Sequence, residues 1–229
     1  DAAAGGELRQ AREERHLPLD DPRAGLRILV PKTVVLDRMD DEVGRAFERA
    51  LGRLSQAGAR IVEREVPLLA RLPELAAGGG IVAAEAYAWH RELLAEKGEV
   101  YDPRVRSRIR LGETIPAGEY QRLIALRNAF IREARRDFAA FDVVAMPAVP
   151  IVAPPLSAFE TDEAFTDLNR LLLRNPSVAN LLDACAISLP CHEPGRAPVG
   201  LGLTALGGQD RRLLAIAAAA EAALRASVA

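Results

Sequence analysis

The pattern of apolar and polar positions divides the first third of the chain into two short strands and one helix. Leu26–Val30 and Ile61–Val66 are short strand-like runs, and a proline follows each of them. Between them apolar residues recur at helical spacing, Asp40 or Asp41 can cap the helix start, and Gly58 ends it. A strand, a helix and a strand in this order predict a parallel pair with a right-handed crossover. The chain is therefore predicted to be an α/β protein.

The middle third of the chain has helical periodicity. Gly78–Gly80 precede a predicted helix over Ile81–Glu96. This glycine triplet lacks the preceding strand and the lysine of a phosphate-binding loop, so it indicates a flexible break. A longer helix over Tyr120–Phe138 has an apolar stripe that contains Arg127, and a charge there must be paired or bind something. One side of the first helix carries Val82, Glu85, Trp89 and Leu93.

A proline-rich loop follows a third predicted strand. Asp142–Met146 is apolar after its first residue, and four prolines follow between residues 147 and 155. Prolines in this number favour an extended, rigid loop at the carboxyl end of the strand. Ligand sites in open α/β sheets lie at that end of the strands. The loop is therefore a candidate part of a binding site.

A helical segment precedes the last two strands. Phe159–Leu173 predicts a polar loop and a helix. Asn175 and Pro176 are typical of a helix cap and a first-turn proline, so they predict a second, short helix over Val178–Ala184.

The last two predicted strands are joined by a turn rich in proline and glycine. Ala186–Leu189 is stopped by Pro190, and Val199–Leu206 follows the turn. Gly200 and Gly202 in the second strand leave room for another backbone or for a ligand. We expect this hairpin to lie in the core.

Composition and charge exclude several classes of function. With 229 residues, 49% of them apolar, the chain is long enough for one large domain or two small ones. Its net charge of -2 has no basic stripe, so a nucleic acid partner is not expected. No apolar run approaches the roughly 20 residues of a membrane span. Two cysteines and no signal-peptide pattern favour the cytoplasm with free thiols.

A search for catalytic motifs is mostly negative. The chain has no GxSxG or SxxK, and its two lysines, Lys32 and Lys97, do not lie near serine-rich segments. It has no HExxH or CxxC, and its three histidines are scattered, so neither a metal nor another cofactor is expected. Cys191 and His192 are adjacent, but neighbours in a strand point in opposite directions and form a poor catalytic dyad. Cys185 is expected in the core.

The order of these segments resembles the C-terminal half of an amidase signature family enzyme. This family includes bacterial amidases, allophanate hydrolases and the A subunit of the tRNA-dependent amidotransferases. The resemblance runs nearly end to end, and it is carried by the order and spacing of motifs that are weak individually. The matching stretches are DAA at Asp1–Ala3, AGLRILVP at Ala24–Pro31, EAYAWH, VRSRIRLG at Val105–Gly112, FDVVAMPAVPIVAPP, NLLDACAISLPC at Asn180–Cys191, PVGLGL at Pro198–Leu203, and QDRRLLAIAAAAE.

The resemblance implies a fold and an activity. The expected fold is the C-terminal part of the amidase signature fold, a mixed, largely parallel sheet flanked by helices. It would occupy residues 23–229, with residues 1–22 as a helix or linker leading into it. Family members hydrolyse amides with a serine, a second, cis-bonded serine and a lysine, which all belong to the N-terminal half. We therefore expect this chain to lack the catalytic groups and to need that half as a partner.

The resemblance also implies substrate-binding residues and leaves alternatives open. Arg108 corresponds to an arginine that holds a substrate carboxylate in the amidotransferase subunits; the other interpretation is a local pair with Asp102 or Glu113. Leu173 stands where those subunits carry an aspartate for a substrate amino group. Three further positions depart from the family pattern around the pocket wall. The expected substrate-binding residues are Arg108, Pro147, Cys191 and His192, and the departures are Asp183, Cys185 and His192.

Two classes of function follow from these observations. The favoured hypothesis is the substrate-shaping half of an amidase that acts on a small-molecule amide. The alternative is a non-catalytic structural or interaction module. If this chain lacks the half that normally packs on it, we expect it to expose an apolar patch and to form a homodimer or aggregates.

Overall fold

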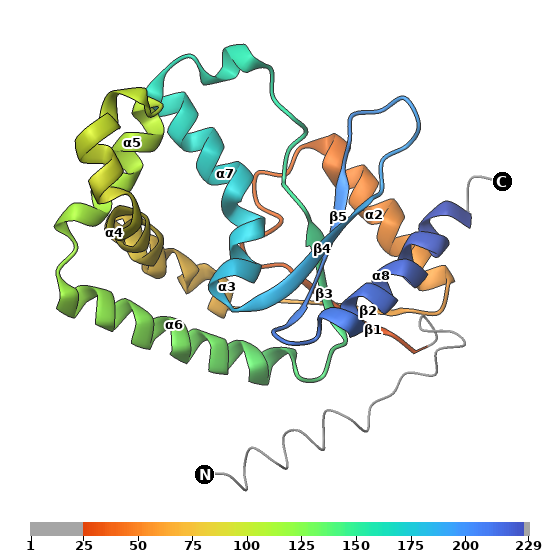
Figure 1. Ribbon diagram of the computed structural model, residues 1–229. Coiled ribbons are helices and arrows are strands. Elements are labelled where there is room, and N and C mark those ends of the chain that lie inside the picture. The colour runs from red at the N-terminus through yellow and green to blue at the C-terminus, as the bar shows by residue number, and fades with distance from the viewer. Residues whose placement is uncertain (1–24, 227–229) are drawn as a thin grey trace, which may run out of the picture.

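The core of the protein is a mixed five-stranded sheet with strand order β2-β1-β3-β5-β4 (Figure 1). A computed structural model describes residues 25–226, so the predicted leading segment over residues 1–22 lies outside the described residues. The strands are β1 (Arg27–Pro31), β2 (Arg60–Arg64), β3 (Val143–Pro147), β4 (Ala184–Pro190) and β5 (Gly200–Leu206).

The strand directions confirm the predicted mixed, largely parallel sheet. β1 pairs in parallel with both β2 and β3, as the strand, helix, strand pattern predicts. β5 runs antiparallel to β3 and to β4, so four strands share one direction and β5 alone is reversed within the described sheet. The carboxyl ends of β1 and β3 consequently lie at the same edge of the sheet.

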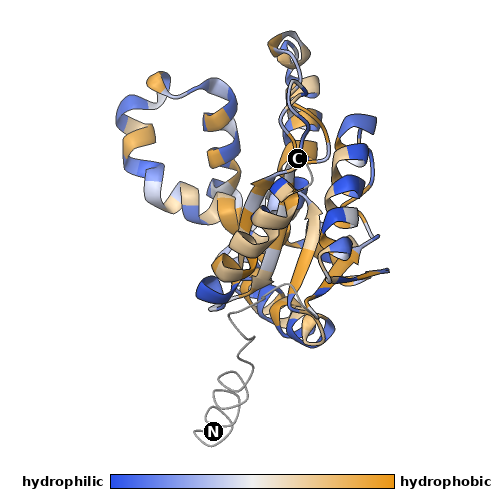
Figure 2. Ribbon diagram, turned by 90° about the vertical axis from the view of Figure 1, so that its right-hand side faces the viewer, coloured by the Kyte–Doolittle hydropathy of each residue, from blue (hydrophilic) through white to orange (hydrophobic). Residues whose placement is uncertain are grey.

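Helices cover both faces of the sheet (Figure 1). α2 and α8 pack on one face, and α3, α6 and α7 pack on the other. Figure 2 shows mostly hydrophobic strands between helices of mixed character. The helices are α2 (Asp41–Gln56), α3 (Leu68–Arg71), η1 (Leu72–Gly79), α4 (Gly80–Lys97), η2 (Gly98–Val100), α5 (Pro103–Arg110), η3 (Leu111–Thr114), α6 (Ala117–Phe138), η4 (Leu156–Phe159), α7 (Asp162–Leu181) and α8 (Asp210–Arg225).

Strand alternation divides the interior into two apolar cores. Leu201, Leu203 and Ala205 of β5 face α2 and α8, whereas Val144 and Met146 of β3 face the opposite layer. Since successive side chains of a strand point to opposite faces, one sheet supplies both cores. Burial of apolar area on both faces is the main stabilising contribution to this fold.

The short helix predicted over residues 178–184 is wrong. α7 runs unbroken from Asp162 to Leu181, with Pro176 inside it. A proline costs about 3 kcal/mol in a helix interior. Val178 and Leu182 are buried against the sheet, and Asn175 makes buried tertiary hydrogen bonds, so tertiary contacts offset the local cost. Local sequence alone cannot include that compensation.

The glycine triplet forms a packed turn between η1 and α4, and not the predicted flexible break. Gly78, Gly79 and Gly80 all have positive φ angles, of 62°, 97° and 63°. A Cβ on Gly80 would lie 2.1 Å from the Leu75 carbonyl oxygen. Only glycine combines this backbone conformation with this close approach.

The predicted stripe on α4 exists, but it faces outward. Val82, Trp89 and Leu93 expose 72%, 84% and 44% of their surface. Ala83 and Leu94, on another side of the helix, are buried instead. Within residues 25–226 no helix is long and apolar enough to cross a membrane, and no cluster of metal-ligating side chains occurs.

Candidate functional site

The loops after β1 and β3 meet at the carboxyl edge of the parallel strands, and Asp40 joins them. Its Oδ1 accepts a hydrogen bond from the Val43 N–H (2.8 Å) and thereby caps α2. Its Oδ2 accepts from the Val152 N–H (2.8 Å) in the proline-rich loop. The Asp40 N–H also donates to the Pro150 carbonyl (3.0 Å). One carboxylate thus fixes the proline-rich loop against the start of α2.

Asn175 of α7 connects the same two loops from within the protein. Its side chain is 3% exposed, and Nδ2 donates to the carbonyl oxygens of Val35 (3.0 Å) and Pro147 (2.8 Å). Oδ1 accepts from Arg174 Nε (2.9 Å). Buried carbonyls need such donors, because an unpaired polar group in the interior is costly. Sequence reasoning assigned Asn175 to a helix cap and missed this role.

Arg174 extends this connection to the loop after β1. Its two terminal nitrogens donate to the carbonyl oxygens of Asp37 (2.6 Å) and Val35 (2.8 Å). Burial lowers the pKa of Arg174, and the negative charge of Asp37 opposes that effect. The sequence signal that could have located this anchor is the polar pair Arg174 and Asn175 directly after three leucines, Leu171–Leu173.

Pro147 ends β3 and is buried at this edge. The following Ala148 N–H donates to the Gly200 carbonyl oxygen (2.8 Å). A Cβ on Gly202 would lie 3.0 Å from the Met146 carbonyl oxygen, and one on Gly200 only 2.2 Å from Ser188 Oγ. The sequence predicted that either another backbone or a ligand comes close to these glycines. The neighbouring strands account for the close approach.

Cys191 and His192 lie where β4 leaves the sheet, and they make separate contacts. Cys191 is 7% exposed, and burial raises the pKa of its thiol to about 11, although Arg49 and Arg53 oppose the shift. His192 Nδ1 accepts from the Val199 N–H (3.3 Å) across the hairpin. Among the described residues no hydrogen bond joins the two side chains. Their assignment to a substrate-binding rim stays a prediction.

Arg108 lies exposed on α5, and both local acids proposed as its partners are engaged elsewhere. Asp102 Oδ1 caps α5 by accepting from the N–H groups of Arg104 and Val105, and Glu113 hydrogen-bonds to Tyr87. No hydrogen bond or ion pair of the Arg108 side chain occurs within residues 25–226. Its guanidinium is free to bind an anion in this structure.

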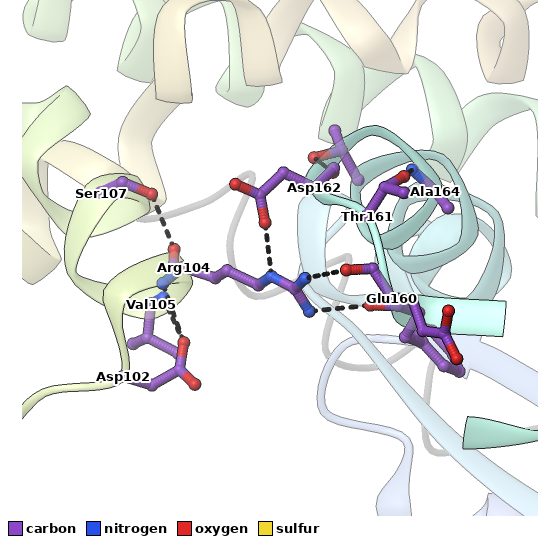
Figure 3. Close-up of polar contacts among 10 residues, drawn as sticks. Asp102, Arg104, Val105, Ser107, Glu160, Thr161, Asp162 and Ala164 are labelled. Carbon is purple, nitrogen blue, oxygen red and sulfur yellow. Dashed lines mark hydrogen bonds and ion pairs between the residues drawn. The ribbon is translucent and has the colours of Figure 1, made fainter. Parts of the chain in front are cut away.

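Arg104, one turn earlier on α5, has the structural role that the local interpretation gave to Arg108. Figure 3 shows its guanidinium reaching from α5 to the start of α7, where Nε donates to Asp162 Oδ1 (2.7 Å). Its other nitrogens donate to the carbonyl oxygens of Phe159 (3.0 Å) and Glu160 (3.3 Å). The guanidinium also lies over the Phe165 ring, 4.6 Å from its centroid.

Arg104, Arg174 and Asn175 hold loops and helices in position, and their side chains are not nucleophiles. Lys32 and Lys97 are exposed, and their side chains make no hydrogen bond within the described part of the chain. The hydroxyls of Ser107 and Ser177 donate to helix carbonyls. Asp40 and Asn175 therefore hold the loops at the carboxyl edge of β1 and β3 in place, and Arg108 is an exposed cation on α5.

Comparison with known proteins defines the family. The amidase family model matches residues 9–214, and the chain belongs to this family. It is 34% identical over 213 residues to 2-amino-5-chloromuconic acid deaminase of Comamonas testosteroni. That alignment covers 92% of this chain but 46% of the relative, so the chain spans about half the relative's length.

Solved structures show the amidase fold directly. The chain superposes on allophanate hydrolase of Kluyveromyces lactis with a TM-score of 0.75 and 22% identity, over 87% of this chain and 32% of that one. It superposes on a crystal structure of an amidase with a TM-score of 0.71 and 27% identity, over 87% and 46% of the two chains. The family and fold that the sequence motifs resemble are both confirmed.

Proposed function

We propose that this chain forms the substrate-binding half of an amidase that hydrolyses the C–N bond of a carboxylic amide to an acid and ammonia or an amine. The observation that carries the proposal is the family match over residues 9–214 in a chain that spans 46% of its relative. In this proposal the catalytic serine, the cis-bonded serine and the lysine come from polypeptide that the chain does not cover.

The proposed reaction proceeds in two steps, acylation of the serine and hydrolysis of the acyl-enzyme. The serine oxygen forms a bond to the amide carbon, its proton passes through the second serine to the lysine, and the C–N bond breaks as nitrogen is protonated. Water then attacks the acyl-enzyme, releases the acid and restores the serine. The described residues contribute by binding the substrate, with Asp40 and Asn175 holding the loops of the wall in place.

Arg108 is the proposed ligand of a substrate carboxylate. The support is its exposure, its lack of a partner within residues 25–226, and the engagement of Asp102 and Glu113 with other groups. A guanidinium binds a carboxylate with two parallel hydrogen bonds. The Comamonas testosteroni relative is named for an acid, which agrees with a carboxylate-bearing substrate. Leu173, 44% exposed, favours a substrate without an amino group at that position.

Substrate kinetics of the complete amidase test this assignment. We expect Arg108→Ala to raise KM at least tenfold for a carboxylate-bearing amide, because the charge-assisted contact is worth about 1.5–3 kcal/mol. KM for the matching uncharged amide should stay within twofold. Arg110→Ala, which removes another exposed arginine of the same helix, is the matched control. An unchanged KM in Arg108→Ala would return this residue to a structural role.

The second candidate is a non-catalytic interaction module. Large apolar side chains exposed on α4, among them Val82 and Trp89, favour it because they form a contact surface without reactive groups. Ammonia release separates the candidates. If the complete protein releases no ammonia from simple amides, the module is supported. If the purified 229-residue chain releases it unaided, the proposed absence of catalytic groups is wrong.

The partner and the compartment belong to the same proposal. The remaining amidase half is the expected partner, with a homodimer as the other state. The proposed compartment is the cytoplasm, where the free thiols of Cys185 and Cys191 stay reduced.

A further inference from the structure

α5 carries Arg108, the proposed carboxylate ligand, but little apolar burial holds this helix in place. Of its eight residues only Ile109 is buried. An isolated helix shorter than about 12–15 residues is marginal in water, and most helices in proteins are fixed by the burial of an apolar face. Contacts of its polar side chains and of its flanking backbone must therefore set the orientation of α5.

The carboxyl end of α5 is held on α4 by close backbone packing. Gly112 lies in η3, directly after α5, and a Cβ at this position would overlap with the Ala83 carbonyl group of α4. Only glycine allows two backbones to approach so closely. In the same turn Glu113 hydrogen-bonds to Tyr87, also on α4. This end of α5 consequently has one position relative to α4.

The other end of α5 is held by arginines. Arg106 donates to the Gly98 carbonyl oxygen (2.9 Å) in the preceding turn η2. Arg104 reaches further, to the start of α7, where Asp162 and two backbone carbonyls accept its hydrogen bonds (Figure 3). Within residues 25–226 it is the one α5 side chain that is hydrogen-bonded to α7 or to the turn before it. Arg104 therefore fixes the distance between the two helices.

Arg104 and Arg108 are four residues apart, so they lie on the same face of α5. All three nitrogens of the Arg104 guanidinium donate hydrogen bonds. Arg108 makes no hydrogen bond or ion pair within the described part of the chain. The first arginine is an anchor, and the second is a free cation whose place is set by that anchor.

We propose that Arg104 is a positioning residue, which holds α5 against α7 so that Arg108 stays where it meets the substrate carboxylate. The inference rests on the proposed function, in which Arg108 binds that carboxylate. Two parallel hydrogen bonds to a carboxylate require a defined position and plane of the guanidinium, so displacement of α5 weakens the binding.

Substrate kinetics of the complete amidase with two probes test the inference. The probes are adipamate, an amide with a carboxylate at its other end, and hexanamide, the uncharged amide of the same chain length. We expect Arg104→Ala to raise KM about fivefold for adipamate and less than twofold for hexanamide, with kcat unchanged for both, because only binding depends on Arg108. A merely structural role of Arg104 would change both amides equally.

Arg71→Ala is the matched control. Arg71 donates to Glu133 of α6 (3.1 Å), and its guanidinium lies over the Phe130 ring, 4.7 Å from the ring centroid. This variant therefore also removes an ion pair and a cation–π contact between two elements, but it leaves α5 and α7 untouched. We expect it to leave the ratio of the two KM values unchanged.

A double-mutant cycle shows whether Arg104 acts through Arg108. In the Arg108→Ala background, Arg104→Ala should change KM for adipamate less than twofold, because the group to be positioned is gone. Asp162→Ala is a milder variant that removes the ion pair from the other side. The Asp162 side chain is 81% exposed in the first turn of α7, so the helix should fold without it. This variant should also raise KM for adipamate more than for hexanamide.

Hydrogen exchange measures the hold on α5 without catalysis. In the full 229-residue chain we expect the amides of α5 to exchange at least tenfold faster in Arg104→Ala, because local opening costs less once the anchor is lost. Exchange in α5 should be unchanged in Arg71→Ala.

Several outcomes would overturn the inference. These are unchanged exchange in α5, equal changes of KM for both probes, an added effect of Arg104→Ala in the Arg108→Ala background, or a changed KM ratio in Arg71→Ala. The proposed function fails separately. If the complete protein hydrolyses neither probe while α5 exchanges faster in Arg104→Ala, the function is removed and the anchor stands. If Arg108→Ala raises KM for adipamate and Arg104→Ala does not, the function stands and the positioning role is wrong.

Discussion

At the scale of single residues, Asn175 and Asp183 show how the surrounding backbone restricts which residue types suit a position. Asn175 donates to two buried carbonyls that belong to loops far away in sequence. Asp183 has a φ of 54°, a conformation that favours glycine and that aspartate tolerates better than most residues. Asp183 is one of the three positions that depart from the family pattern, and the residue found there is one that this backbone conformation tolerates.

The buried thiol of Cys191 gives a pH-dependent prediction. Its pKa is raised to about 11 by burial, against about 8.5 for an unfolded cysteine. The unfolded chain therefore loses this proton first as pH rises. We expect the free energy of unfolding to fall between pH 8.5 and 11, by on the order of 3 kcal/mol from this group. Below pH 8 the contribution is fully retained.

Urea unfolding at several pH values measures this effect. Cys191→Ala should flatten the decrease between pH 8.5 and 10.5, because it removes the titrating group. Cys185→Ala is the control, because it also removes a thiol whose pKa is raised by burial, but one that is only half-buried. Equal slopes for the original chain and Cys191→Ala would contradict the prediction.

At the scale of elements, arginines one turn apart on α5 have different surroundings. Arg104 links α5 to the start of α7 through three hydrogen bonds, whereas Arg108 has no partner in residues 25–226. The sequence did not separate these two residues, because the contacts of Arg104 come from residues more than 50 positions away.

Substitution of the two arginines tests this distinction. We expect Arg104→Ala to lower the free energy of unfolding by about 1–2 kcal/mol, because two carbonyls and one carboxylate lose their donor. Arg108→Ala should change it by less than about 0.5 kcal/mol, as exposed unpaired residues do. Chemical denaturation of both variants measures the difference. Similar losses for both would show that Arg108 has a structural partner.

Other elements follow from the sequence to different degrees. The parallel pair of β1 and β2 and the cap at Asp40 follow from hydrophobic periodicity and local turn chemistry. The continuation of α7 through Pro176 does not, because packing of Val178 against the sheet decides it. Strand order likewise depends on pairing between distant segments.

At the scale of the whole molecule, Trp89 reports on the outer face of α4. It is the single tryptophan of the chain and is 84% exposed. We expect the purified chain at micromolar concentration to show the red-shifted emission of a hydrated indole and strong quenching by iodide. At higher concentration, self-association through exposed apolar side chains should shift the emission to the blue and reduce quenching.

Light scattering at the same concentrations identifies the associated species. Trp89→Ala lacks the fluorescent group, so Leu93→Glu on the same stripe serves as the variant and should reduce self-association. Leu214→Glu, at an exposed apolar position of α8, is the matched control. A monodisperse monomer at all concentrations would contradict the prediction of association.

The sequence by itself determined the α/β class, the parallel β1–β2 unit and the family. These features depend on periodicity, turn residues and motif order, which local sequence contains. The tertiary structure decided that Asn175 joins two loops, that Arg104 has partners and Arg108 has none within residues 25–226, and that β4 lies at one edge of the described sheet. Each of these depends on which distant backbone groups lie within hydrogen-bonding distance, and only the folded chain brings those groups together.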